Sequence, residues 1–105
     1  MDNYKITRQD ESIIVSISGR LDTPRASKLD LDTQNLLTAE IKAVTFEIGE
    51  LNYISSSGIR CFVRIYKEAK ANGSEFKVKN MQPSIREIFD ATGISKILGI
   101  RAYWV

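Results

Sequence analysis

Apolar and polar residues alternate in two segments near the start of the chain, Tyr4–Thr7 and Ile13–Ser18. Alternation with a period of two is typical of a strand that buries one face. The polar residues 8–12 between the two segments leave room for only a short connection. We therefore expect these segments to form an antiparallel pair of strands.

Later segments place apolar residues at helical spacing instead. The first helix is expected from Pro24 to about Leu37, because Thr23 suits the N-cap and proline suits the first helical position. The second helix is expected from Ile59 to Ala71, and a third, shorter helix is expected to begin at Pro83.

The same spacing assigns the faces of these helices. On the first helix, Asp30 is expected to face outward. On the second helix, five apolar residues share the buried face: Ile59, Phe62, Val63, Tyr66 and Ala69. Arg60 and Arg64 lie on the opposite face, and Cys61 and Ile65 fall on the margin between the two. The second helix is therefore predicted to be amphipathic.

Three further strands are expected at Val44–Ile48, Glu75–Lys79 and Ala102–Val105. Strands joined through helices of this length pair in parallel by right-handed crossovers. Several strands alternate, whereas parallel strands covered on both faces have continuous apolar runs. The predicted fold is therefore α/β, with a mixed, mostly parallel sheet of four to five strands and helices mainly on one face.

The composition narrows the class of protein. With 105 residues, of which 43% are hydrophobic, the chain is expected to form a single domain over residues 1–105. A formal net charge of +2 is too small to indicate a nucleic-acid-binding face. No apolar run approaches the ~18 residues of a membrane span, so no membrane contact is expected. The single cysteine excludes an internal disulfide and is compatible with a reducing compartment, so we expect a cytoplasmic protein.

The chain contains no histidine, so no Ser-His or Cys-His catalytic unit can be built from it. With one cysteine, a tetrahedral zinc site is not expected either. Asp22 and Glu47 are expected at strand ends, on the same edge of the sheet as Ser55–Ser57, and they could act as paired carboxylates, but capping and surface solvation are commoner roles. Cys61 could have a lowered pKa near a helix start, but with no base nearby in sequence it is interpreted as a small filler. We therefore expect no enzymatic activity, no bound metal and no cofactor.

The segment Asn52–Gly58 lies where a buried strand gives way to the second helix. In an open α/β sheet, this edge carries the functional surface. Four roles are open for its serines: Ser56 or Ser57 caps the helix, the loop binds an anion, a serine acts as a nucleophile, or a kinase modifies a serine. The missing histidine and G-x-S-x-G elbow argue against a nucleophile, and the missing G-x-x-x-x-G-K-[ST] loop argues against the anion site. Capping and phosphorylation are the main alternatives.

Two stretches resemble the STAS domain family, and in particular its small bacterial anti-sigma factor antagonists. They are residues 17–23, with the sequence ISGRLDT, and residues 46–59, with the sequence FEIGELNYISSSGI. Residues 72–73, 83–89 and 92–97 agree in the same order, so the resemblance covers nearly the whole chain.

In that family a D-S-S-G or D-S-T-G segment follows a strand, and the serine after the aspartate is phosphorylated. This serine corresponds to Ser56, which is followed by Ser57 and Gly58, while Ser55 takes the place of the aspartate. The resemblance therefore implies that Ser56 is phosphorylated, ahead of Ser57 or Ser55.

The resemblance further implies a partner switch. The unphosphorylated domain binds an anti-sigma factor, which is also a serine kinase with an ATP-binding fold, and so frees the sigma factor. The kinase phosphorylates Ser56 and the complex dissociates, and a metal-dependent serine phosphatase resets the switch. ATP and magnesium belong to the kinase, so the chain itself needs no cofactor.

The partner is expected to contact the serine segment and the exposed flank of the helix that follows it. The expected contact residues are Asp22, Ser55, Ser56, Ser57, Gly58, Arg60, Cys61, Arg64 and Ile65. The alternative is a STAS domain that does not switch and serves as a scaffold or accessory subunit, in a signalling complex or a lipid-transport system. The serine in place of the aspartate favours this alternative.

Overall fold

A computed structural model of the chain describes residues 3–99. Four strands and four helices follow one another within this part of the chain. Their bounds are β1 (Tyr4–Gln9), β2 (Ser12–Leu21), α1 (Thr23–Asp32), β3 (Ala43–Ile54), α2 (Ser56–Asn72), β4 (Glu75–Lys79), α3 (Pro83–Ala91) and α4 (Ile94–Ile97). The expected last strand, Ala102–Val105, lies outside the described residues.

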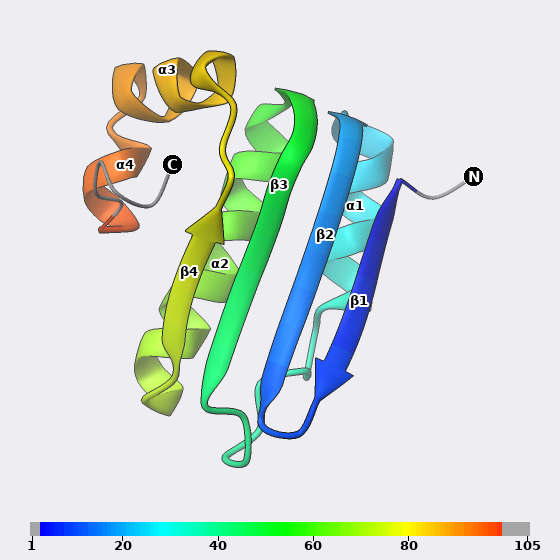
Figure 1. Ribbon diagram of the computed structural model, residues 1–105, viewed down its shortest axis with the longest axis vertical. Coiled ribbons are helices and arrows are strands. Elements are labelled where there is room, and N and C mark those ends of the chain that lie inside the picture. Colours follow the sequence, from blue (N-terminus) through cyan, green and yellow to red (C-terminus); the bar gives the residue numbers. More distant parts are fainter. Residues whose placement is uncertain (1–2, 100–105) are drawn as a thin grey trace.

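The four strands form one sheet in the order β1-β2-β3-β4, with β1 at one edge and β4 at the other (Figure 1). β1 and β2 pair antiparallel across the short connection at residues 10–11, as the alternation predicted. β2 pairs with β3 in parallel, and β3 pairs with β4 in parallel. The prediction of a mixed, mostly parallel sheet is therefore confirmed.

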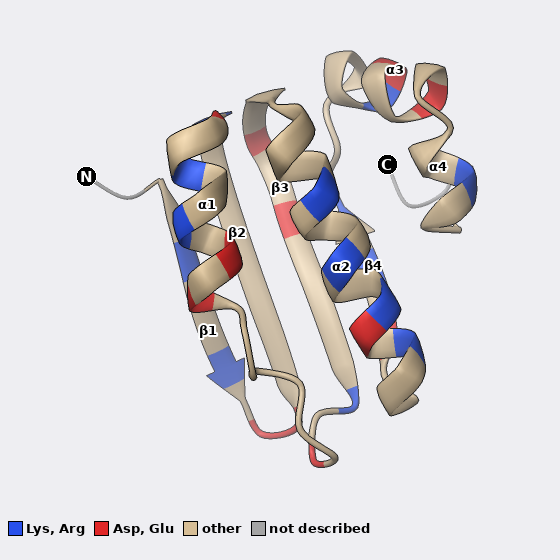
Figure 2. Ribbon diagram, turned by 180° about the vertical axis from the view of Figure 1, so that it is seen from behind, with Lys and Arg blue, Asp and Glu red and all other residues tan. Residues whose placement is uncertain are grey.

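α1 and α2 lie side by side on one face of the sheet, and the core lies between the two layers (Figures 1 and 2). The ring of Phe46 on β3 stacks on the ring of Phe62 on α2, with centroids 4.1 Å apart. Phe89 of α3 meets Phe62 edge-on at 5.9 Å. The opposite face of the sheet carries no helix of the described residues, which confirms the prediction of helices mainly on one face.

Helix α1 differs from the prediction at both ends. Its N-cap is Asp22, whose carboxylate accepts a hydrogen bond from the backbone N–H of Arg25 in the first turn. Thr23 is therefore the first helical residue rather than the cap. The helix ends at Asp32 instead of Leu37. Asn35 has a φ of 63°, a left-handed conformation through which a right-handed helix cannot continue.

Strand β3 continues to Ile54, well beyond the predicted Val44–Ile48. Its pairing with β2 shifts register twice, along β2 residues 16–18 and 19–20, and β3 has the extra residue each time. Such bulges keep a strand paired while they bend and twist it. As a result the strand reaches Ser55 without an intervening loop.

Cys61 and Ile65 are only 2% and 3% exposed. The prediction that they lie on the margin of α2 is therefore wrong. The reason is that α1 packs along this side of α2 (Figure 2). Ile59 and Val63, which were assigned to the buried face, are only partly buried. The buried face of α2 is thus rotated toward α1.

The described part of the chain ends with two short helices. α3 begins at Pro83, as predicted, and buries Ile85 and Phe89. Gly93 then adopts a φ of 79° and precedes α4. Among residues 3–99, none of the helices has the length and apolar character that a membrane crossing requires.

Candidate functional site

The parallel strands β2 and β3 end side by side, and each gives way directly to a helix. Leu21 pairs with Ile54, and the backbone N–H of Ser55 donates to the carbonyl of Leu21 at 2.9 Å. Asp22 and Ser55 then occupy the N-caps of α1 and α2. Asp22 and the serines therefore lie at one edge of the sheet, as predicted. We call this region, residues 20–22 and 53–58, the serine edge.

The three adjacent serines have different environments. Ser55 is 7% exposed, and its hydroxyl oxygen accepts a hydrogen bond from the N–H of Gly58 at 3.1 Å. Ser57 is half-buried, and its hydroxyl oxygen accepts a hydrogen bond from the Arg60 guanidinium at 3.2 Å. Ser56, the first residue of α2, is exposed, and its hydroxyl has no hydrogen-bond partner within residues 3–99. Of the three, Ser56 alone presents an unengaged hydroxyl to solvent.

The expectation that Ser56 or Ser57 caps α2 is wrong, because the cap is Ser55. β3 runs to Ile54, so Ser55 is the last residue with extended backbone angles before the helix, at φ −81° and ψ 167°. Serine and aspartate are about equally good N-caps. Ser55 can therefore perform the capping role that an aspartate would have at this position.

Gly58 allows α2 to start close against the ends of β2 and β3. A Cβ atom at this position would lie 2.7 Å from Cγ1 of Ile54 and 2.9 Å from Cδ2 of Leu21. Carbon atoms in van der Waals contact are about 3.5–4.0 Å apart, so any side chain would push the first turn of the helix away. The glycine is thus required by packing rather than by backbone angles.

The sequence patterns did not point to two exposed residues of the serine edge, Arg20 and Tyr53. The Arg20 guanidinium lies over the ring of Tyr53, 4.0 Å from its centroid. The second bulge of β3 sets these two residues opposite each other, and the alternation of the strand contains no signal for it. Beside them, Asp22 forms a 2.7 Å ion pair with Arg25. The edge therefore carries an aromatic and cationic surface next to the serines.

Arg64 is engaged with other side chains rather than free on the surface. Its guanidinium donates to the Asp30 carboxylate on α1 at 2.7 Å, to the Thr33 hydroxyl at 2.6 Å, and to Glu68. Burial alone would lower the pKa of Arg64, but its hydrogen bonds to Asp30 and Glu68 and their charges raise it. Asp30 thus faces Arg64 of α2 and is only partly exposed, whereas the prediction placed it on the outer face, and Arg64 connects the two helices.

Cys61 is one of the residues that line a groove between α1 and α2. The groove has a volume of about 380 Å³, and its lining includes Ser27, Asp30, Ser57, Arg60 and Arg64. Burial, with the nearby Asp30 carboxylate, raises the pKa of the Cys61 thiol to about 11. The thiol is therefore protonated at neutral pH, which agrees with its interpretation as a small filler.

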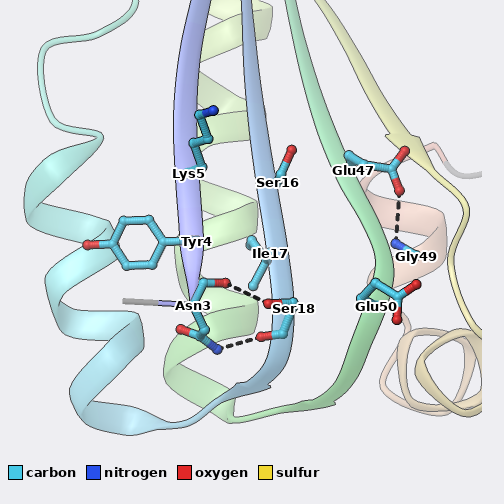
Figure 3. Close-up of a pocket in the computed structure, with 9 residues that line it drawn as sticks. All are labelled: Asn3, Tyr4, Lys5, Ser16, Ile17, Ser18, Glu47, Gly49 and Glu50. Carbon is cyan, nitrogen blue, oxygen red and sulfur yellow. Dashed lines mark hydrogen bonds between the residues drawn. The ribbon is translucent and has the colours of Figure 1, made fainter. Parts of the chain in front are cut away.

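Glu47 lies away from the serine edge, contrary to the prediction. It sits in the middle of β3 on the face without a helix, and its carboxylate accepts hydrogen bonds from the N–H of Gly49 at 3.0 Å and from Nδ2 of Asn80 at 2.7 Å. A shallow hollow of about 320 Å³ extends from Glu47 to Lys5 on β1 (Figure 3). Seven residues of β3 lie between Glu47 and Ser55, and each residue of a strand spans ~3.3 Å. Since Asp22 lies beside Ser55, Glu47 is too far from Asp22 for the two to act as paired carboxylates.

Comparisons with known proteins agree with this fold. Residues 3–103 match the family model described as the STAS domain. The anti-sigma-B factor antagonist of Bacillus subtilis (strain 168) is 26% identical over 102 residues, which cover 95% of this chain and 91% of that protein. The anti-sigma F factor antagonist of Paenibacillus polymyxa is 26% identical over 90 residues, with coverages of 84% and 76%. The solved structure of the unphosphorylated anti-sigma factor antagonist SpoIIAA is 15% identical and has a TM-score of 0.73, with coverages of 93% and 98%, which shows a shared fold.

Proposed function

Because the chain belongs to the STAS domain family, we propose that it is an anti-sigma factor antagonist in a partner-switching pathway. Its relatives from Bacillus subtilis and Paenibacillus polymyxa are named as antagonists of anti-sigma factors. In its unphosphorylated form the protein binds an anti-sigma factor that is also a serine kinase, and this binding frees the sigma factor. Phosphorylation of Ser56 by that kinase dissociates the complex, and a metal-dependent serine phosphatase restores the binding form.

In this pathway the chain is a cytoplasmic binding protein rather than an enzyme. Its sequence contains no histidine that could serve as a general base, and the Cys61 thiol is protonated at neutral pH. ATP and magnesium are supplied by the kinase, and the chain contributes the hydroxyl that accepts the phosphoryl group.

The observation that carries the proposal is the difference between Ser56 and its two neighbours. The hydroxyl of Ser55 is buried in the cap of α2, and the hydroxyl of Ser57 is bonded to Arg60. Ser56 is exposed and unengaged within residues 3–99, which supports it as the acceptor. The serine in place of the aspartate is compatible with the switch, because Ser55 provides the cap that an aspartate would provide.

The proposed partner surface follows from the exposure of the expected contact residues. Ser56 and Arg60 are exposed and Asp22 is half-buried, so their side chains are available to a docked protein. Cys61 and Ile65 are buried. These two residues therefore influence partner binding only through the packing and position of α2. The same holds for Arg64, whose guanidinium is bonded to Asp30 and Glu68.

Phosphorylation at this edge opposes docking for electrostatic reasons. A phosphate adds roughly −1.5 to −2 charge near neutral pH. Burying that charge in an interface to which the partner supplies no matching cation costs several kcal/mol. Since ~1.4 kcal/mol corresponds to a tenfold change in affinity, this cost is large enough to dissociate the complex.

Labelling by the cognate kinase tests the proposal. Incubation with the kinase and ATP should add one phosphate, which mass spectrometry of peptides should place on Ser56. The Ser56→Ala variant should not be labelled, whereas Ser57→Ala should be labelled at the wild-type rate. Normal labelling of Ser56→Ala, or kinase binding by Ser56→Asp as tight as that of the wild type, would contradict the switch.

The alternative is a STAS domain that does not switch and serves as a scaffold or accessory subunit of a signalling complex or a lipid-transport system. The observation in its favour is the serine at position 55, although its role as N-cap weakens that argument. Affinity purification separates the two functions. Recovery of a kinase-fold partner favours the switch, and recovery of a transporter subunit or a large homo-assembly favours the scaffold.

A further inference from the structure

Arg60 is an exposed cation that no carboxylate within residues 3–99 neutralises. Its guanidinium donates a hydrogen bond to the hydroxyl of Ser57 at 3.2 Å. Arg64, one turn further along α2, differs because Asp30 and Glu68 bind its guanidinium. Arg60 therefore keeps donors available for an anion.

The position of Arg60 relative to Ser56 brings the two side chains onto one face of α2. Ser56 is the first residue of the helix and Arg60 follows four residues later, a spacing at which helical side chains are neighbours. Side chains also tilt toward the N-terminus of their helix, so Arg60 extends back over the first turn. The hydrogen bond to Ser57, three residues before Arg60, demonstrates this reach.

We propose that, once Ser56 is phosphorylated, the Arg60 guanidinium exchanges the Ser57 hydroxyl for the phosphate and holds it within the same chain. The inference rests on the proposed function and names the residue that binds the modified serine. Arginine can bind a phosphate through two parallel N–H···O bonds, each stronger than a bond to a neutral hydroxyl. Before phosphorylation the partner meets an exposed cation. Afterwards it meets a pair with net negative charge, because the phosphate outweighs the single charge of Arg60.

Phosphoserine incorporated at position 56 during translation allows a test without the kinase. Titration followed by ³¹P NMR then gives the second pKa of the phosphate group. Arg60 stabilises the dianion, so this pKa should be lower in the wild type than in Arg60→Gln, by about half a pKa unit, the scale of an exposed ion pair. Arg60→Lys should restore part of the difference, and about 1 M NaCl should remove most of it.

Lys67→Gln is the matched control. Lys67 is an exposed cation on the same helix, about 16 Å from Ser56 along the axis, and its removal should leave the phosphate pKa unchanged. Coinciding titration curves for the wild type and Arg60→Gln would overturn the proposal. An equal shift in Lys67→Gln would also overturn it, because the effect would then come from the general field of the helix. Since no kinase is needed, the outcome is independent of whether a kinase accepts Ser56.

Discussion

The hydroxyl of Ser55 accepts a hydrogen bond from the backbone N–H of Gly58 at 3.1 Å, which makes Ser55 the N-cap of α2. This contact removes Ser55 from the hydroxyls that a kinase could reach and leaves Ser56 at the first helical position. It also gives a physical reason why serine can stand where the family motif has aspartate, since both residues can accept the same hydrogen bond.

Replacement of Ser55 should separate capping from phosphorylation. Ser55→Ala leaves the N–H of Gly58 without its acceptor and should lower the free energy of unfolding by about 1 kcal/mol. Ser55→Asp keeps an acceptor and should stay within a few tenths of a kcal/mol of the wild type. Urea denaturation measures both, with the exposed Ser56→Ala as control. Equal stability of Ser55→Ala and the wild type would refute the capping role.

Gly58→Ala should destabilise the protein even though alanine is the better helix former. The new Cβ would lie 2.7 Å from Cγ1 of Ile54, and overpacking of this kind costs about 1–3 kcal/mol. The gain in helix propensity offsets only about 0.5–1 kcal/mol of that cost. Thermal unfolding should therefore show a lower Tm, whereas the exposed control Ala71→Gly should lose stability through propensity alone. A Gly58→Ala variant as stable as the wild type would contradict the close packing.

The ion pair between Arg64 and Asp30 should contribute measurably to the packing of α1 on α2. A double-mutant cycle with Arg64→Gln and Asp30→Asn should give a coupling energy of about 1 kcal/mol, reduced by solvent because both side chains are partly exposed. The more exposed pair of Arg8 and Glu40 is the control and should couple by less than about 0.5 kcal/mol. Equal coupling in the two cycles would mean that Arg64 is an ordinary surface cation.

Cys61 should make the protein less stable as the pH rises through the alkaline range. Its thiol has an ordinary pKa of 9.0 and a pKa of about 11 in the fold, so above pH 9 the unfolded chain loses its proton first. The unfolded state is then favoured, by about 1.4 kcal/mol for each pH unit between the two values. Urea denaturation between pH 8 and pH 11 should show this loss in the wild type and a smaller loss in Cys61→Ala. Parallel pH profiles would show that the thiol titrates normally in the fold.

Arg60→Glu should weaken binding of the cognate kinase without destabilising the fold. The substitution places a carboxylate four residues from Ser56, with the same sign of charge as the phosphate. For a charge at an interface rim we expect about a tenfold loss of affinity, mainly through the association rate. Surface plasmon resonance measures this loss, and Lys67→Glu serves as the control for general charge. If Arg60→Glu binds as tightly as the wild type, the partner does not use this face of α2.

Much of the fold follows from local sequence patterns. The alternation in Ile13–Ser18 and Glu75–Lys79 predicted strands with one buried and one solvent-exposed face, and β2 and β4 show this alternation of burial. The second helix was expected to end at Ala71, and α2 ends one residue later, at Asn72, before Gly73 with a φ of 75°. These features depend on neighbours within one turn or one strand, so the sequence alone determines them.

Tertiary structure decided the features that distinguish the serine edge. The pattern of apolar and polar residues does not distinguish the three adjacent serines. The two bulges let β3 continue to Ile54, so that Ser55 becomes the N-cap of α2 and Ser56 is exposed at the first helical position. The burial of Cys61 and the 2.7 Å contact of Arg64 with Asp30 both require α1 to lie against α2. Arg64 and Asp30 are 34 residues apart in the chain, so no local periodicity encodes their contact. Only the packing of the two helices on one sheet brings these groups together.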